Sequence, residues 1–368
     1  PAPPSPPLSS AWFPYQQGWL GADGAYSVPL GGDRILWIFG DTFIGAPGAT
    51  SRKHATGFIH NSIAISTCPG KVNCTFWYHW QRMNTPNPRP MFFTGTGGWF
   101  WPMDGFVDRG TLYVALMQMH STGTGGPFGF AYSGVQLASI HNYAALPSQW
   151  SVTYQKLNTG GSAIPGVSII VEDALHGNPD SSTPRGADYV YFFTLVGSST
   201  PAMHLSLLRL PRRELHKAAR PGKAAWEYLA SDSTWRPWAE TATVLPGDSA
   251  AVFRPGATEM TVRYHSSTHQ WIAVYPGGLA NAAYYSLSPA MTGPWGPAKK
   301  LYAYPEMEPA NPNYTPNVFC YAAKEHVELE APEQLFFTYA CNSSREGEVI
   351  GNMNLYHPVV VTQPLPRR

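Results

Sequence analysis

The chain has 368 residues and a formal net charge of +1. This near-neutral balance argues against a nucleic-acid partner, because there is no basic stripe to neutralise phosphates. The sequence has no apolar run of about eighteen residues, the length that a membrane span needs. Aromatic residues make up 14% of the chain and charged residues only 13%, about half the usual charged share. With 35 Gly and 36 Pro, this composition favours an all-β fold of many short strands, which at this length often forms one domain.

The N-terminal residues 1–17 form a Pro/Ser-rich leader, which begins PAPPSPPLSS and has no hydrophobic core. We interpret this leader as the segment that remains after removal of a signal peptide. We therefore expect a secreted protein whose folded domain covers residues 18–368. The sequence leaves its oligomeric state open.

Three short β-strands are predicted after the leader, at Ala22–Leu30, Arg34–Phe39 and Phe58–Ser66. Gly31-Gly32-Asp33 is a turn signal that makes a hairpin of the first two. In an up-and-down meander, the start of the first strand, the end of the second and the start of the third lie at the same edge of the sheet.

That edge gathers four polar residues, Asp23, Asp41, His60 and Asn61. Two carboxylates with a histidine beside them suit acid–base chemistry on a sugar. We interpret the His60-Asn61 pair as the support of the two acids. The alternative is that Asp23-Gly24 and Gly40-Asp41 are ordinary turn residues, as Asp-Gly pairs often are.

Four cysteines indicate an oxidising compartment. Cys68 and Cys74 flank a Pro-Gly turn, and Cys320 and Cys341 fall on two strands of a predicted hairpin. Each pair can be neighbours without any long-range assumption, so we expect two local disulfides. A zinc site is disfavoured because there is neither C-x-x-C spacing nor paired histidines, and no metal ligands are predicted.

A strand–turn–strand unit recurs five times along the chain, each time with an apolar, aromatic-rich second strand. These units open near residues 23, 104, 172, 259 and 317. Four are followed by two further predicted strands, and the fifth by only one, at Asn352–Val361. This pattern predicts a five-bladed β-propeller with four antiparallel strands per blade, in which the N- and C-terminal segments close the ring. The predicted blades cover approximately residues 18–90, 91–160, 161–235, 236–305 and 306–368. A β-sandwich with a second domain would not explain five similar hairpins, and the one helical pattern is at Arg212–Ala219.

The first strand of each blade in such a propeller lines the central channel, so the residues that open these strands converge on one face. They are Asp23, Asp104, Glu172 with Asp173, Glu259 and Asn317. A crowded set of acids raises the pKa of some members, as a general acid at neutral pH requires. The alternative is that Asp104 and Glu259 bind backbone amides or hold a calcium ion on the axis.

Aromatic residues at the same edge favour a carbohydrate ligand. Trp19, Trp99 and Trp101 lie in segments that enter the first strand of a blade. Planar rings stack on the C–H faces of sugars, while carboxylates and Asn bind the hydroxyls. The alternative is that these rings fill the space between blades.

Three segments of the chain, GADGAYSVPL…LWIFGDTFIG…HNSIAI, WPMDGFVDRGTLYV and ATEMTVRYHSSTHQWIAVY, resemble secreted five-bladed propellers long described as domains of unknown function. Some members of that group are endo-acting D-arabinofuranan hydrolases, and the fold is similar to that of the arabinanases and α-L-arabinofuranosidases. The resemblance covers the chain from Gly18 onward. It implies a glycoside hydrolase whose essential aspartates are Asp23 and Asp41, with arabinofuranan as substrate and no required cofactor.

The more distant arabinanase pattern takes its three acids from three blades. Asp23, Asp104 or Glu172, and Glu259 would fill these places, in a looser match. If Asp23 and Asp41 face each other, a separation of ~5–5.5 Å fits a retaining mechanism, which we favour slightly; Asp23 with Glu259 at ~6.5–9.5 Å would fit inversion. The remaining alternatives are an exo-acting furanosidase on another glycan, a lectin-like propeller without catalysis, and a lactonase or esterase with an axial calcium ion.

Overall fold

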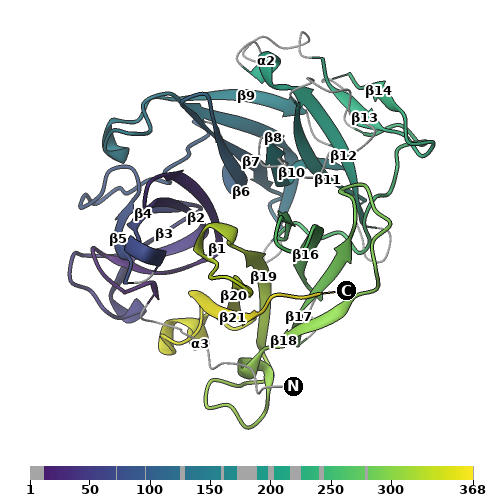
Figure 1. Cartoon of the computed structure of the whole chain (residues 1–368). Helices are drawn as coiled ribbons and strands as arrows, with labels where there is room; N and C mark the ends of the chain where they lie inside the picture. Colours follow the sequence, from purple (N-terminus) through teal and green to yellow (C-terminus); the bar gives the residue numbers. More distant parts are fainter. Residues whose placement is uncertain are drawn as a thin grey trace.

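The chain folds into five antiparallel sheets arranged in a ring, so the five-bladed β-propeller is confirmed (Figure 1). This computed structural model describes residues 12–71, 73–95, 97–124, 129–158, 161–171, 189–197, 203–215, 225–239, 244–277 and 281–367. The sheets follow one another around the ring in chain order, so the purple first blade lies beside the yellow end of the chain. None of the helices in these ranges has the length and apolar character that crossing a membrane requires.

The first three blades contain the strands up to residue 237. Blade 1 consists of β1 (Trp19–Gly31), β2 (Arg34–Gly45), β3 (Ala55–Ile59), β4 (Ser62–Thr67) and β5 (Thr75–His79). Blade 2 consists of β6 (Trp99–Asp108), β7 (Thr111–Ser121), β8 (Phe130–Ile140) and β9 (Val152–Asn158). Blade 3 consists of β10 (Ala163–Val171), β11 (Tyr189–Val196), β12 (His204–Pro211), β13 (Glu227–Leu229) and β14 (Trp235–Pro237).

The last two blades have the same plan. Blade 4 consists of β15 (Thr261–His265), β16 (Gln270–Pro276), β17 (Ala282–Ser288) and β18 (Lys299–Ala303), and blade 5 of β19 (Val318–Glu325), β20 (Gln334–Ser343) and β21 (Pro358–Pro364). The helices are short: α2 (Arg212–Leu215), α3 (Glu346–Gly351) and the 3₁₀ turns η1 (Arg52–His54), η2 (Pro69–Lys71), η3 (Pro147–Gln149), η5 (Pro305–Met307) and η6 (Val327–Leu329).

Contacts between the first strands of the blades close the ring. Each of β1, β6, β10, β15 and β19 contacts the first strands of both neighbouring blades, and β1 contacts β19. The channel between them is filled by side chains. Tyr26 of β1 is 1% exposed, and its hydroxyl lies 3.2 Å from the carbonyl oxygens of both Val167 and Thr258, in blades 3 and 4.

The N-terminal segment joins blade 1 to blade 5 through side chains. The ring of Phe13 packs edge-on to Trp37 with centroids 4.9 Å apart, and Trp12 packs on Phe336 of β20 at 5.0 Å. Blade 5 has three strands, and no described residue of the N-terminal segment adds a fourth. The expected outer strand is therefore absent from residues 12–18, and residues 1–11 lie outside the described part.

The structure corrects three predicted elements. The single strand expected at Phe58–Ser66 is two strands, β3 and β4, which pair with different halves of β2. The strand expected at Asn352–Val361 begins only at Pro358, after α3. Blade 3 has a fifth strand, β14, beyond the four expected. The helical pattern at Arg212–Ala219 is a helix over Arg212–Leu215, and residues 216–219 lie outside the described part.

Both predicted disulfides are confirmed. Cys68 pairs with Cys74 across the turn between β4 and β5, and Cys320 of β19 pairs with Cys341 of β20. The second pair occupies directly opposed positions in the hairpin register, so the strands bring the two thiols together without any further chain movement.

Candidate active site

A β-bulge in the first hairpin brings Asp23 and Asp41 together. Ala22 pairs with Thr42 and Gly24 with Phe39, so Asp23 of β1 lies opposite both Gly40 and Asp41 of β2. Such a bulge redirects side chains and is frequent beside active sites. A Cβ at Gly40 would overlap the Oδ1 atom of Asp23, so any larger residue here would displace that carboxylate.

Asp23 lies in a partly buried environment with two other acids. Burial, together with the charges of Asp41 and Glu259, raises its pKa well above the ordinary value, and a hydrogen bond from Tyr321 offsets part of that rise. The Tyr321 hydroxyl lies 2.7 Å from Asp23 Oδ2, and the Tyr356 hydroxyl lies 3.3 Å from the same atom. A carboxyl group with this raised pKa is suited to donate a proton near neutral pH.

Asp41 has different surroundings. Its side chain is 19% exposed, and its Oδ1 atom lies 2.9 Å from His60 Nδ1. The indole N–H of Trp101 donates to the same oxygen at 2.9 Å, so two rings orient the carboxylate. His60 in turn stacks on Trp99 with centroids 4.5 Å apart. The structure therefore brings Asp41, His60, Trp99 and Trp101 together, and their roles stay predictions.

Glu259 lies just before β15 and pairs with a buried lysine. Its Oε1 atom is 3.2 Å from Lys324 Nζ, which also donates to the carbonyl of Gly24 at 2.8 Å. Burial lowers the pKa of Lys324, and the Glu259 charge offsets part of that shift. The Glu259 side chain remains 27% exposed, and its charge contributes to the raised pKa of Asp23, so the two carboxylates lie near each other.

Asp104 is not available to a ligand. It is 0% exposed, and both its oxygens accept hydrogen bonds from Arg263 Nη2, at 2.9 and 3.1 Å. The backbone N–H groups of Gly105 and Ile169 also donate to it. The predicted substrate contact of Asp104 is wrong, because this carboxylate joins blades 2, 3 and 4 inside the core. The alternative, an acid bound to backbone amides near the axis, is the one observed.

Two other residues that were predicted at the site, Asn61 beside the acids and Trp19 as a sugar contact, are buried as well. Asn61 is 0% exposed, and its amide donates to the carbonyls of Phe92 and Phe100. Trp19 is 0% exposed and stacks on Tyr78 with centroids 4.5 Å apart. Both predictions are wrong, because these side chains fill the space within and between blades.

The last three residues predicted to bind the substrate are Asn317, Glu172 and Asp173. The half-buried Asn317 donates to Glu348 at 2.8 Å, which connects the start of β19 to α3 and leaves its substrate contact a prediction. Glu172 and Asp173 lie outside the described residues.

Sequence reasoning missed Tyr321, Tyr356, Lys324 and Gly40. Tyr321 is the fourth residue of β19 and points to the same face as the acids, a position that the five-hairpin pattern could have indicated. Lys324 is 0% exposed, and a lysine is rarely buried this fully unless it is paired, as this one is with Glu259. Nothing in its local sequence, YAAKEHV, distinguishes it from a surface residue.

Two groups of described residues have the composition of a metal site, and neither includes Asp23, Asp41 or Glu259. His265, Glu325 and Glu330 present ligand atoms within 4.8 Å of one another, at the far ends of β15 and β19. Glu306, Cys320 and Cys341 form the other group, but their thiols are consumed in a disulfide. The calcium ion on the axis stays a prediction.

Comparison with protein families assigns almost the whole chain to a single family. A family described as "Domain of unknown function (DUF5005)" matches residues 10–362. The chain belongs to this family. No curated protein is significantly similar to this DUF5005 chain in sequence.

Among solved structures, the DUF5005 chain resembles a Bacteroides ovatus protein described as a candidate hydrolase, with a TM-score of 0.69, 17% identity, and coverage of 96% of this chain and 88% of the other. A xylan β-1,4-xylosidase from Bacillus halodurans gives a TM-score of 0.48 at 12% identity, with 96% and 54% covered. A Cellvibrio cellulosa α-L-arabinanase mutant gives 0.45 at 13% identity, with 94% and 92% covered. The first likeness concerns the fold alone, and the other two are too low to support any argument.

Proposed function

We propose that this protein is a secreted glycoside hydrolase that cleaves internal glycosidic bonds of a polysaccharide, with an arabinofuranan as its substrate. The observation that carries the proposal is the pair of carboxylates on either side of one bulge, Asp23 and Asp41, in unlike surroundings. Pairs of acids whose surroundings differ in this way divide the roles of acid and base between them. The two disulfides support an oxidising, extracellular compartment.

In the proposed mechanism, Asp23 is the general acid and gives its proton to the glycosidic oxygen as the bond to the anomeric carbon breaks. Asp41 attacks that carbon and forms a covalent glycosyl ester. Asp23, now ionised, takes a proton from water, which hydrolyses the ester and restores both groups. Glu259 is the alternative partner of Asp23, in which case an activated water attacks directly and the anomeric configuration inverts.

The ligand side of the proposal rests on the rings beside Asp41. The His60 side chain is 36% exposed and stacked on Trp99, which leaves an aromatic surface next to the carboxylate. Such surfaces bind the C–H faces of sugar rings. Arabinofuranan and endo action are the parts of the proposal that depend on the family resemblance.

The test is product analysis by mass and by anomer-resolved NMR on L-arabinan, D-arabinan, xylan and galactan. We expect oligosaccharides from an arabinan with the wild-type protein, and a loss of about 10²–10⁴-fold in rate for Asp23→Asn and Asp41→Asn. Asp33→Asn, which changes an exposed aspartate in the β1–β2 turn, is the matched control and should be fully active.

Near-normal turnover in either active-site variant would contradict the residue assignment. Release of monosaccharide alone would favour exo action, and no release from any of the four glycans would overturn the proposed activity. The first-formed anomer decides between Asp41 as nucleophile and the inverting alternative with Glu259.

A further inference from the structure

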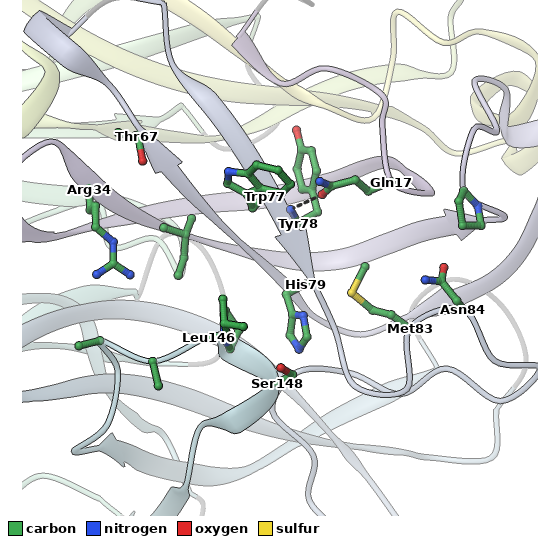
Figure 2. Close-up of a pocket in the computed structure, with 15 residues that line it drawn as sticks. Gln17, Arg34, Thr67, Trp77, Tyr78, His79, Met83, Asn84, Leu146 and Ser148 are labelled. Atoms are coloured by element: carbon green, nitrogen blue, oxygen red, sulfur yellow. Dashed lines mark hydrogen bonds between the residues drawn. The ribbon is translucent and has the colours of Figure 1, made fainter.

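A groove of about 550 Å³ lies on the outer side of the ring, away from the carboxylates. It runs between β5 of blade 1 and residues 144–148 of blade 2, which come after β8. Figure 2 shows its lining, in which Trp77 and His79 of β5 face Leu146 and Ser148 across the groove, with Arg34 at one end and Asn84 at the other. Asp23, Asp41, Glu259 and the rings beside them are not part of it.

Trp77 is the unusual residue of this groove. Its exposed fraction is 65%, whereas the other twelve tryptophans of the chain are half-buried or buried. The indole has no hydrogen bond or ring contact among the described residues. Trp77 is not isolated, because it lines the groove together with Ile65, Met83 and Leu146. A continuous exposed apolar surface of this kind indicates a binding site.

The backbone beneath Trp77 is held firmly. The neighbouring Phe76 and Tyr78 are 2% and 3% exposed. Although β5 is the last strand of its sheet, side chains of the N-terminal segment satisfy its outer edge, because Gln16 donates to the carbonyl of Phe76 and the N–H of Tyr78 donates to Gln17. The indole is therefore presented from a rigid strand, so little conformational entropy is lost when a ligand stacks on it.

The rest of the lining combines apolar side chains, among them Ile65, Met83 and Leu146, with polar groups that are almost uncharged. His79 is largely neutral at pH 7, because burial lowers its pKa, and its imidazole can both donate and accept hydrogen bonds. Asn84 and Ser148 add an amide and a hydroxyl, and Arg34 is the single charged residue of the lining. None of the described residues that line the groove is a carboxylate, so they do not favour a cationic ligand. A flat ring flanked by neutral hydrogen-bonding groups matches the alternating C–H faces and hydroxyls of a saccharide.

We propose that this groove is a second, non-catalytic binding site for a neutral oligosaccharide segment of the polysaccharide substrate. A pocket of this size is within the usual range for small ligands. The exposed indole and the neutral hydrogen-bonding groups among the apolar side chains favour this occupant, and the identity of the glycan rests on the proposed function. Binding here would hold a polymer to the enzyme and would leave the hydrolysis of short oligosaccharides unchanged.

The experiment is affinity electrophoresis in gels containing L-arabinan, D-arabinan, xylan or galactan. The inactive Asp41→Asn protein is used so that the polymer is not degraded, and it is compared with the same protein carrying Trp77→Ala, Trp77→Phe or the control Val244→Ala, an exposed apolar residue elsewhere. We expect Trp77→Ala to bind the retarding polymer about tenfold more weakly. Trp77→Phe should keep part of the affinity, and Val244→Ala all of it.

Equal retardation of the Trp77→Ala protein, or no retardation of the parent protein in any gel, would overturn this proposal. Sedimentation provides the other arm: a dimer that Trp77→Ala converts to monomer, without any effect on glycan binding, would assign the groove to a second copy of the chain instead. Retardation that depends on Trp77 in a protein that hydrolyses none of the glycans would support the groove and overturn the proposed activity, so the two failures are distinguishable.

Discussion

Asp23 acquires its chemistry from residues that are distant in the sequence. Tyr321 and Tyr356 donate to it from blade 5, while Asp41 and Glu259 place negative charge beside it from blades 1 and 4. Both tyrosines remain protonated donors, because burial and the Asp23 charge raise the pKa of each phenol well above its ordinary value. The local Asp-Gly pair shows none of this, and by itself it is typical of a turn.

The raised pKa of Asp23 makes stability depend on pH. Because the folded carboxyl holds its proton more tightly than the unfolded one, the stability that the protonated group contributes is fully present below the unfolded pKa near 4 and is lost as pH rises toward the folded pKa. Asparagine cannot ionise, so Asp23→Asn should gain stability over the wild type, at up to about 1.4 kcal/mol per pH unit within this window. Thermal melts from pH 4 to pH 8 measure it.

The expected result is a difference in Tm near zero at pH 4 that grows as pH increases. Asp33→Asn removes the same charge from the exposed β1–β2 turn and should show no such growth. A Tm difference between Asp23→Asn and wild type that stays constant from pH 4 to pH 8 would mean that the pKa of Asp23 is not raised.

At the scale of single strands, β6 illustrates how a correct element can contain a wrongly interpreted residue. The strand is found where the pattern WPMDGFVDRGTLYV predicts it, and Asp104 lies in its middle. Arg263 of β15 and the N–H of Ile169 in β10 both meet this carboxylate. Asp104 therefore links three blades by hydrogen bonds. Its oxygens cannot bind a sugar, because protein donors already occupy them.

Asp104→Asn should consequently reduce stability and leave catalysis nearly intact. The variant leaves the Arg263 guanidinium, whose side chain is 16% exposed, without its counter-charge, and breaking one partner of a buried pair costs about 3 kcal/mol or more. Urea unfolding measures the loss of stability. At urea concentrations well below the unfolding midpoint, kcat and KM should remain within about twofold of wild type.

The control for this variant is Asp232→Asn, which breaks the exposed pair with Arg236 and should change the urea midpoint little. A large drop in kcat for Asp104→Asn, with unchanged stability, would restore Asp104 to the catalytic residues.

For the whole molecule, closure of the ring depends on a buried cation. Arg52 of η1 is 2% exposed and donates to the carbonyl of Leu20 in blade 1 at 2.8 Å. It also donates to the carbonyls of Val349 and Asn352 in blade 5, at 2.7 and 3.0 Å. A propeller without a complete fifth blade needs such a joint, since the described part of blade 5 has only three strands.

Arg52→Met should therefore loosen the contact between the first and last blades. Several buried carbonyls lose a charged donor, and the expected cost is about 3 kcal/mol or more in the free energy of unfolding. Hydrogen exchange should show the largest loss of protection in β1 and β21. The exposed neighbour Lys53 supplies the control, Lys53→Met. Equal destabilisation of the two variants would contradict the role of Arg52 in linking the first and last blades.

The repeating hairpins, the two disulfides and the all-β class could be predicted from the sequence, because each depends on contacts between residues close in the chain. Turn signals and apolar alternation specify a strand locally, and Cys320 and Cys341 oppose each other within one hairpin. The pair Asp23 and Asp41 could be predicted for the same reason, since a single hairpin carries both.

Tertiary structure alone decided which polar residues are free to act. Asp104, Asn61 and Trp19 have the same residue types as functional side chains, but burial and contacts within or between blades commit them to the core. Lys324 and Tyr321 enter the site from blade 5, some 300 residues from Asp23 in the chain. Local patterns cannot rank such residues, because desolvation and charge depend on everything that the ring places around a side chain.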